Sequence, residues 1–294
     1  MNGTALPHLY SGKVRELFEI GHDELLMVAT DRISVFDVIL PDEIPDKGRV
    51  LTGLSSYWFD QTRDIAPNHV ISCDPYDFPE TSGSVAGRAM RVRATRPIRL
   101  ECVVRGYLFG GGWSEYQQRG TVGGFTVPAG LQQAEQLPEP LFTPTTKAES
   151  GHDLPVTQGE AVEMVGAEVY EQVRALSLAL YQFGARHAES RGVILADTKF
   201  EFGELDGTIL VIDEMMTPDS SRYWPKDEYR PGISPPSFDK QYVRDFMDST
   251  GWNHEPPAPR VPADVIANTR AKYVEAYELI TGLSFSEWYG SDDD

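Results

Sequence analysis

The segment around residue 200 carries the strongest chemical signal in the sequence. Asp197, Lys199 and Glu201 alternate with Thr198 and Phe200, and alternate side chains of a β-strand point to the same face. Two carboxylates beside an ammonium suit a Mg²⁺–polyphosphate complex, because carboxylates bind this hard cation and the ammonium neutralises phosphate oxygens. The spacing is equally compatible with a solvated strand face that holds two salt bridges.

A further carboxylate, Asp213, is the last residue of the next predicted strand. A two-residue loop between the strands at 193–202 and 208–213 would turn Asp213 away from Glu201. A three-residue loop with Gly207 in the left-handed conformation would instead place Asp213 opposite Lys199, on the same face. Burying so many charges without a ligand is costly. We therefore predict the three-residue loop, with Glu201 and Asp213 as metal ligands.

Residues 217–224 combine a proline, Asp219, two serines, Arg222 and two aromatic residues. Short acceptors, hydroxyls and a guanidinium in one turn can hold a sugar phosphate. A proline followed by aspartate and serine is more commonly the capped start of a helix. Both interpretations remain open at this stage.

A second arginine segment ends the predicted strand at 98–104. Arg105 is followed by a glycine-rich turn at 110–112, whose backbone N–H groups could form an anion-binding nest. Five further arginines lie at 88–99. We expect most of these five simply to balance neighbouring carboxylates on an exposed strand.

The N-terminal segment places Lys13 and Arg15 on one strand face after the turn at Gly12. This arrangement resembles an edge that covers phosphates, but one Gly-Lys pair is a weak signal. The P-loop spacing, the GxGxxG fingerprint and the kinase His-Arg-Asp triplet are all absent from the sequence. P-loop NTPases and ordinary protein kinases therefore do not fit.

The polar, proline-containing stretch at 138–155 is predicted to be a long loop with a function. Within it, Lys147 is the better candidate, because a flexible cation can bind a phosphate or a carboxylate. His152 could be a base, but a single loop histidine beside an aspartate is more often structural. We find no motif for covalent or zinc catalysis.

Composition limits the class of protein. The chain has 294 residues, with 26 Lys+Arg against 45 Asp+Glu and a net charge of −19, so its field repels nucleic acids and anionic membranes. A hydrophobic fraction of 40% excludes wholesale disorder. Cys73 and Cys102 form no CxxC pattern, and no secretory signal or transmembrane run is visible. We expect a cytoplasmic protein without a disulfide framework.

Patterning predicts a mixed α+β fold. Thr157 and Glu160 form a capping box that opens a helix to about residue 190, and Gly282 ends a terminal helix. The remaining predicted elements are strands at 13–20, 24–30, 33–40, 89–94 and 98–104, a helix at 50–63, a hairpin at 193–213 and a helix at 263–281. We place a β-rich domain at 1–100 and an α+β domain at 101–294, with a helical extension from about 238.

Taken together, these segments resemble the SAICAR synthetase family (phosphoribosylaminoimidazole-succinocarboxamide synthases). The pairing of the Asp-x-Lys-x-Glu-Phe-Gly block with Ser-Ser-Arg-Tyr-Trp is highly specific. The motifs that carry the resemblance are, in order, 11–16 (SGKVRE), 31–37 (DRISVFD), 44–48 (IPDKG), 101–108 (ECVVRGYL), 142–149 (FTPTTKAE), 197–203 (DTKFEFG) and 213–224 (DEMMTPDSSRYW).

The resemblance implies a fold and a reaction. One lobe would be similar to the small lobe of protein kinases and the other to ATP-grasp proteins, with ATP between them. The implied enzyme joins the carboxylate of carboxyaminoimidazole ribonucleotide to the amine of L-aspartate, with Mg²⁺-ATP as the energy source. Phosphorylation of the carboxylate supplies a leaving group, so no protein nucleophile is needed, and positioning and charge neutralisation supply most of the rate.

The resemblance also implies roles for individual residues. The expected set is Glu201 and Asp213 for Mg²⁺; Gly12, Lys13 and Arg15 for the ATP phosphates; Lys199 between nucleotide and substrate; Arg105, Asp219 and Arg222 for the ribonucleotide; and Asp37 and Lys147 in the substrate cleft. Lys199, Lys13 and Arg222 are the expected catalytic residues. One departure concerns Gly111, which stands where members commonly carry a serine, so its backbone N–H would have to replace a hydroxyl contact to the substrate phosphate.

Two other functions are considered. A different ATP-dependent carboxylate–amine ligase would use the same charged strand face with another acceptor amine. A non-catalytic nucleotide-binding regulator would bind ATP without turnover, but it would have no reason to keep Lys13, Lys199, Glu201 and Asp213 together.

Overall fold

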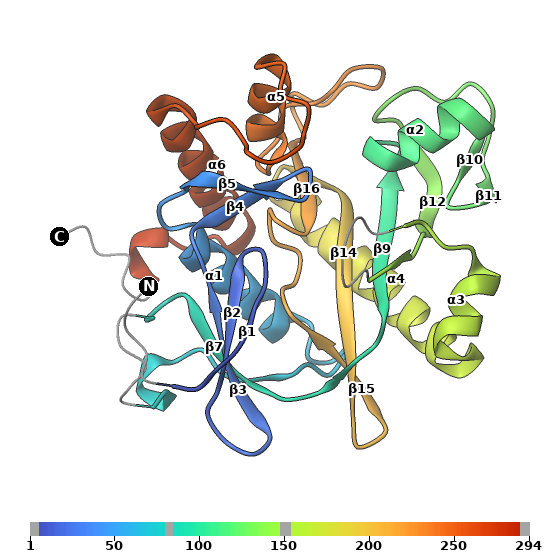
Figure 1. Cartoon of the computed structure of the whole chain (residues 1–294). Coiled ribbons are helices and arrows are strands. Elements are labelled where there is room, and N and C mark those ends of the chain that lie inside the picture. Colours follow the sequence, from blue (N-terminus) through green and yellow to red (C-terminus); the bar gives the residue numbers. More distant parts are fainter. Residues whose placement is uncertain (1–5, 80–84, 148–153, 289–294) are drawn as a thin grey trace.

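The computed structural model describes residues 6–79, 85–147 and 154–288, and two main antiparallel sheets dominate it (Figure 1). The expected α+β class is confirmed. His152, discussed above, lies outside the described residues. Within the described residues, no helix is both long and apolar enough to cross a membrane.

The first sheet is built from the N-terminal hundred residues in the order β1-β2-β3-β7-β6. Helix α1 (Lys47–Gln61), predicted at 50–63, packs against β3 and β7 and buries Leu51, Leu54 and Trp58. The strands are β1 (His8–Ser11), β2 (Arg15–Glu19), β3 (Glu24–Ala29), β6 (Val70–Ser72) and β7 (Ala89–Arg93). The 3-10 helix η1 (Pro75–Asp77) follows β6.

The predicted strand at 33–40 is wrong in one respect. It is a hairpin of β4 (Arg32–Val35) and β5 (Val38–Glu43), because Phe36 and Asp37 both have positive φ, 51° and 65°. Two consecutive left-handed residues reverse a chain tightly. This turn brings Asp37 next to the N-terminal strands.

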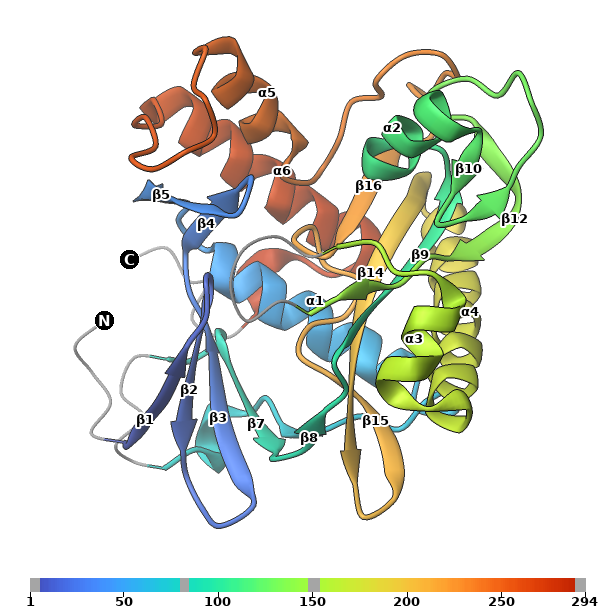
Figure 2. The ribbon, with the colours of Figure 1, turned by 45° about the vertical axis from the view of Figure 1, so that its right-hand side comes forward.

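The second sheet follows the order β12-β9-β14-β15, with β8, β13 and β16 paired to its central strands. Helices α3 (Gln158–Val165) and α4 (Ala167–Ser190) form one layer, and α4 covers β14, β9 and β12 (Figure 2). The strands are β8 (Arg96–Pro97), β9 (Leu100–Tyr107), β12 (Gln136–Phe142), β13 (Thr145–Thr146), β14 (Val193–Leu205), β15 (Thr208–Ile212) and β16 (Ser221–Pro225).

Helix boundaries agree with the local signals. Thr157 and Glu160 form both bonds of the predicted capping box, although Gly166 divides the expected single helix into α3 and α4. Helix α6 (Ala263–Thr281) ends at Gly282, which is left-handed with φ 73°. Helix α5 (Gln241–Ser249), η3 (Phe285–Glu287) and a cis peptide bond at Pro256–Pro257 complete this C-terminal part.

Two expected loops contain regular structure. The glycine-rich turn at 110–112 is the first turn of helix α2 (Gly110–Arg119), which precedes the small hairpin of β10 (Thr121–Val122) and β11 (Phe125–Thr126). The prolines at 138–155 predict an irregular loop. In the structure, however, β12 and β13 lie in this region, and each pairs antiparallel with β9. Proline is tolerated at a sheet edge because the missing N–H need not face another strand.

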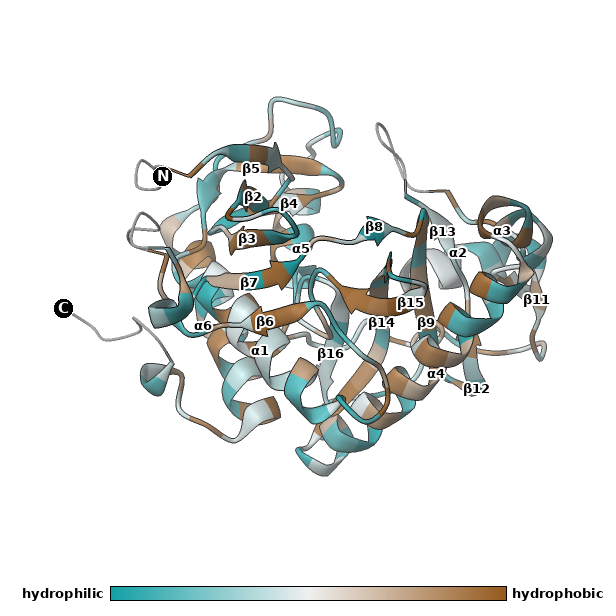
Figure 3. Cartoon of the chain, turned by 90° about the horizontal axis from the view of Figure 1, so that it is seen from below, coloured by the Kyte–Doolittle hydropathy of each residue, from teal (hydrophilic) through white to brown (hydrophobic). Residues whose placement is uncertain are grey.

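The largest hydrophobic core joins the two sheets. Leu54 and Trp58 of α1 and Met90 of β7 belong to the same buried cluster as Cys102 of β9 and Phe200 of β14. Figure 3 shows the corresponding apolar stretches of β7 and β14 in brown. The core is thus continuous across residue 100, and the predicted division into domains there stays a prediction.

Candidate active site

A cavity of about 470 Å³ lies where the first sheet meets β14 and β15. One part of its wall is apolar and comes from Leu17, Leu25, Met27, Val92 and Ile212. The rest is strongly charged. Nine of the residues selected from the sequence line this one cavity: Gly12, Lys13, Arg15, Asp37, Lys147, Lys199, Glu201, Asp213 and Asp219.

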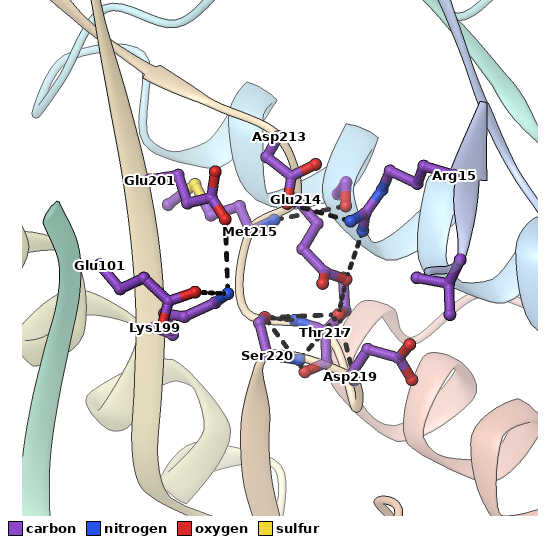
Figure 4. A network of polar contacts seen from close by, with 12 residues as sticks. Arg15, Glu101, Lys199, Glu201, Asp213, Glu214, Met215, Thr217, Asp219 and Ser220 are labelled. Carbon is purple, nitrogen blue, oxygen red and sulfur yellow. Dashed lines mark hydrogen bonds and ion pairs between the residues drawn. The ribbon is translucent and has the colours of Figure 1, made fainter. Parts of the chain in front are cut away.

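Lys199 is at the centre of the charged wall (Figure 4). Its Nζ lies 2.5 Å from Glu101 Oε1 and 3.4 Å from Glu201 Oε1, and Lys147 also pairs with Glu201. Burial alone would lower the pKa of Lys199, but the carboxylates of Glu201 and Glu101 outweigh it and raise that pKa. Lys199 is therefore a permanent cation.

The two expected metal ligands have opposite electrostatic surroundings. Burial would raise the pKa of Glu201, but Lys199 and Lys147 lower it to about 2. Burial raises the pKa of Asp213 to about 6 against the effect of Arg15, with Glu201 and Glu214 adding to the rise. The raised pKa of Asp213 thus comes first from burial and then from the nearby carboxylates of Glu201 and Glu214, and a bound cation would offset both effects.

Arg15 holds the carboxylates of Asp213 and Glu214 in place. Its Nη1 lies 3.0 Å from Asp213 Oδ2 and its Nη2 lies 2.8 Å from Glu214 Oε2. Glu214 also accepts a hydrogen bond from the Thr217 hydroxyl. Figure 4 shows these carboxylates facing Glu201 and Lys199 across the cavity.

The predicted three-residue loop is wrong. Leu205 pairs with Thr208 and Glu201 pairs with Ile212, so the loop has two residues, Asp206 and Gly207, with φ of 50° and 77°. A continued strand would turn Asp213 away from Glu201. Strand β15 ends before it, and Asp213 takes φ 65°, which redirects its carboxylate into the cavity.

At the mouth of the cavity, Lys13 pairs with Asp37, and both side chains are close to half exposed. Gly12 N–H donates to Arg15 O at 2.8 Å, which closes the turn before β2. Arg32 donates to the carbonyl oxygens of Lys13 and Gly12 and thereby fixes the same turn. The turn therefore places the Lys13 ammonium and its partner Asp37 at the entrance, in contact with solvent.

Asp197 does not line the cavity; it binds two arginines instead. On β14 it is the cross-strand partner of Arg105 on one side and of Arg222 on the other. Its Oδ2 lies 3.3 Å from Arg105 Nη1 and 2.5 Å from Arg222 Nη1. Asp197 is therefore neither at the cation site nor on a solvated face beside Lys199; it is buried and holds salt bridges to arginines of the two neighbouring strands.

The same arginines lie beside the start of helix α2. A Cβ on Gly110 would lie 2.6 Å from Arg222 Nη2, and a Cβ on Gly112 would lie 3.3 Å from Arg105 Cδ. Gly111, between them, has open space around its Cβ position. A helix N-terminus with two guanidiniums that share one carboxylate has a net positive charge and unsatisfied N–H groups, which together suit a phosphate.

Sequence reasoning missed several charged residues of the site. Glu101 and Glu214 stand near Arg105 and beside Asp213, and no spacing of their own distinguishes them in the sequence. Lys47 and Lys240 lie far apart in the chain, yet both pair with Asp219, at 2.7 and 3.1 Å. Lys47 belongs to the motif at 44–48, but only contact in three dimensions shows that both lysines pair with Asp219.

Most of the arginines at 88–99 balance carboxylates, as expected. Arg88 pairs with Asp31, Arg91 with Glu24 and Arg96 with Glu204. Arg93 differs, because it lines the cavity.

Comparison with known proteins gives a consistent result. The model of the SAICAR synthetase family matches residues 8–259. The chain is 54% identical over 279 residues to the phosphoribosylaminoimidazole-succinocarboxamide synthase of Desulfosudis oleivorans, covering 93% of this chain and 95% of that one. It is 50% identical over 283 residues to the same enzyme of Chromobacterium violaceum, covering 95% and 100%.

Solved structures agree. A SAICAR synthase from Saccharomyces cerevisiae, complexed with SAICAR, is 39% identical and superposes with a TM-score of 0.86 over 96% of this chain and 97% of that one. A SAICAR synthetase in complex with ADP is 24% identical, with a TM-score of 0.70 over 94% and 98%. At that identity the second comparison concerns the fold alone.

Proposed function

This chain belongs to the SAICAR synthetase family, and from that membership we propose how its residues carry out the family's reaction. The protein is an ATP-dependent ligase of purine biosynthesis that joins the carboxylate of carboxyaminoimidazole ribonucleotide to the amine of L-aspartate. The observation that supports the assignment of residues is the single cavity in which Lys13, Arg15 and Lys199 meet the carboxylates of Glu201 and Asp213. A cytoplasmic location stays a prediction.

The nucleotide fits the cavity as follows. The apolar wall of Leu17, Leu25, Met27, Val92 and Ile212 offers a dry surface for an adenine ring. The polyphosphate then extends toward Lys13, Arg15 and Lys199, with the turn at Gly12 close to it. Lys13 would leave Asp37 and bind the phosphates as a mobile cation.

Glu201 and Asp213 fit a magnesium ion. Mg²⁺ prefers oxygen ligands and is commonly bound by one or two carboxylates, phosphates and water. No group of three or more potential metal-binding side chains occurs among the described residues, so a site that depends on ATP for further ligands is the arrangement these residues allow. The ion would supply charge neutralisation at the phosphates.

The ribonucleotide phosphate is assigned to Arg105, Arg222 and the first turn of α2. The triad around Asp197 carries one positive charge in excess, and Gly111 contributes its backbone N–H. With the phosphate there, Lys199 on the adjoining part of β14 would lie near the reacting carboxylate. Asp219, Asp37 and Lys147 would complete the substrate cleft.

The reaction then needs two transfers. A carboxylate oxygen of the ribonucleotide attacks the γ-phosphorus of ATP, ADP leaves, and an acyl phosphate forms. The amine of L-aspartate attacks the carbonyl carbon, inorganic phosphate leaves, and the nitrogen loses a proton. Lys199 stabilises the charge that develops in the first step, since its raised pKa keeps it protonated.

The test measures ADP release by the purified protein with Mg²⁺-ATP and the ribonucleotide, with and without L-aspartate. Strict dependence on aspartate, with the succinocarboxamide product identified by mass, is the expected result. ATP turnover that ignores aspartate would point to another acceptor amine. ATP binding without turnover would indicate a regulatory protein.

A further inference from the structure

Two clusters in the protein share an unusual stoichiometry, in which two cations bind the same oxygen of one carboxylate. In the first, Arg105 and Arg222 share Asp197 Oδ2. In the second, Lys47 Nζ and Lys240 Nζ lie 2.7 and 3.1 Å from Asp219 Oδ2. Each cluster is left with one positive charge in excess. The first is assigned to a phosphate, and the second has no ligand in the mechanism described so far.

The second cluster is more deeply buried than the first. The side chains of Lys47, Asp219 and Lys240 are 0%, 2% and 10% exposed. Among the described residues, Lys47 Nζ has no well-aligned hydrogen-bond acceptor. Lys47 is also the first residue of helix α1, and the N-terminus of a helix adds positive potential. Uncompensated buried charge is costly, so a protein that keeps this arrangement gains from an anion that completes it.

Neighbouring carboxylates supply only part of that compensation, since Glu214 acts on Lys240 from beyond ion-pair distance. Glu214 is engaged by Arg15 at 2.8 Å and by the Thr217 hydroxyl. Asp239 accepts the backbone N–H of Gln241 at 2.7 Å, while Arg244 adds further positive charge nearby. In the described part of the chain, Asp219 is the one carboxylate within ion-pair distance of either lysine.

The cluster opens into the active-site cavity. Lys240 and Asp219 line it together with Lys199, Glu201 and Asp213. Figure 4 shows Asp219 beyond Thr217, on the opposite side of the view from Glu101 and Lys199. An anion bound at Lys240 would therefore share the cavity with the reacting groups.

We propose that Lys240, positioned by Asp219 and Lys47, binds a carboxylate of the amine substrate, L-aspartate. The inference rests on the proposed function, in which the other anionic groups already have cations: the ATP phosphates have Lys13 and Arg15, and the ribonucleotide phosphate has Arg105. L-Aspartate brings two carboxylates and needs at least one cation that a neutral amino acid would not need. Lys240 thus selects an amine substrate that carries an additional carboxylate.

The test compares Lys240→Met with the wild-type enzyme in the ADP-release assay. Loss of one charge-assisted hydrogen bond should raise the KM for L-aspartate about 10- to 100-fold, with the KM values for ATP and the ribonucleotide within about twofold. The inhibition constant of succinate, a dicarboxylate without the amine, should rise by the same factor. Lys240→Arg should restore most of the affinity, because it keeps the charge.

Lys226→Met is the matched control, since Lys226 forms an exposed pair with Glu189 and should leave all constants unchanged. If Lys240→Met does not fold, as judged by circular dichroism, Lys240→Gln replaces it. An unchanged KM for aspartate in a folded variant, or an equal rise for all three substrates, would overturn the inference. A wild-type enzyme that makes no succinocarboxamide would instead refute the proposed function, so the two failures are distinguishable.

Discussion

Replacing Gly111 by serine should improve binding of the ribonucleotide. Gly111 lies in the first turn of α2, and a Cβ built on it meets nothing within 4 Å. It is not among the glycines with positive φ, so a side chain introduces no backbone strain there. The new hydroxyl can donate to the phosphate that Arg105 and Arg222 are proposed to bind.

The magnitude follows from the nature of the new bond. A hydrogen bond to a charged group contributes about 1.5–3 kcal/mol, part of which is lost to ordering the hydroxyl and to competition with water. A net gain near 1.4 kcal/mol lowers the KM for the ribonucleotide about tenfold. The KM for ATP and for L-aspartate should stay within about twofold.

Gly110 is the matched control one residue away. It has φ 54°, and its Cβ would lie 2.6 Å from Arg222 Nη2. Gly110→Ala therefore adds about 1–2 kcal/mol of left-handed strain and displaces the guanidinium. We expect a rise of about tenfold or more in the KM for the ribonucleotide.

Initial rates of ADP release at varied ribonucleotide concentration measure both variants, and thermal unfolding confirms that both are folded. The reasoning is refuted if Gly111→Ser leaves the KM for the ribonucleotide unchanged while Gly110→Ala is also neutral. The start of α2 would then lie away from the substrate phosphate.

Three other variants test the metal site, the pH response and the packing. Asp213→Asn should reduce turnover by about 100-fold or more while the protein stays folded, because asparagine tolerates the left-handed backbone but loses the charge; full activity at limiting Mg²⁺ would contradict the ligand assignment. Burial lowers the pKa of His69 from 6.5 to about 3. Between these two pH values the unfolded chain binds a proton that the folded protein excludes. The free energy of unfolding therefore falls by about 1.4 kcal/mol per pH unit as the pH drops from 6.5 toward about 3. His69→Gln should therefore lose less stability than the wild type on going from about pH 6.5 to about pH 5, and equal losses in urea unfolding would exclude this role. Gly106→Ala should destabilise by about 1–3 kcal/mol, because its Cβ would lie 1.9 Å from Tyr181 Oη, whereas Gly159→Ala, with open space around it, should be neutral or stabilising; similar midpoints in urea would argue against this steric reasoning.

Much of the site could be predicted because its signals are local. The alternation of residues 197–201 placed Lys199 and Glu201 on one face, and the structure brings both to the cavity. The capping box at Thr157 and the left-handed Gly282 marked helix ends within a residue. These features depend on the chain a few residues either way, which the sequence displays directly.

The failures concern residues whose environment is set by distant parts of the chain. Strand alternation predicts that a two-residue turn after β14 turns Asp213 away from Glu201, yet the left-handed backbone of Asp213 itself corrects the direction. Residues 110–112 suggested a turn and form the start of a helix, where Gly110 is left-handed and Arg105 and Arg222 pack closely against Gly112 and Gly110. Local propensity gives no account of such approaches.

The sequence by itself determined the charged residue types, their order along the chain and the faces they occupy on each strand, because alternation and capping act over a few residues. Tertiary structure decided which charge meets which. Cross-strand register placed Asp197 between Arg105 and Arg222, and the packing of α1 near the C-terminal segment joined Lys47 to Asp219 and Lys240. Coulombic interactions depend on distance in space and on burial, and neither is a property of position in the sequence.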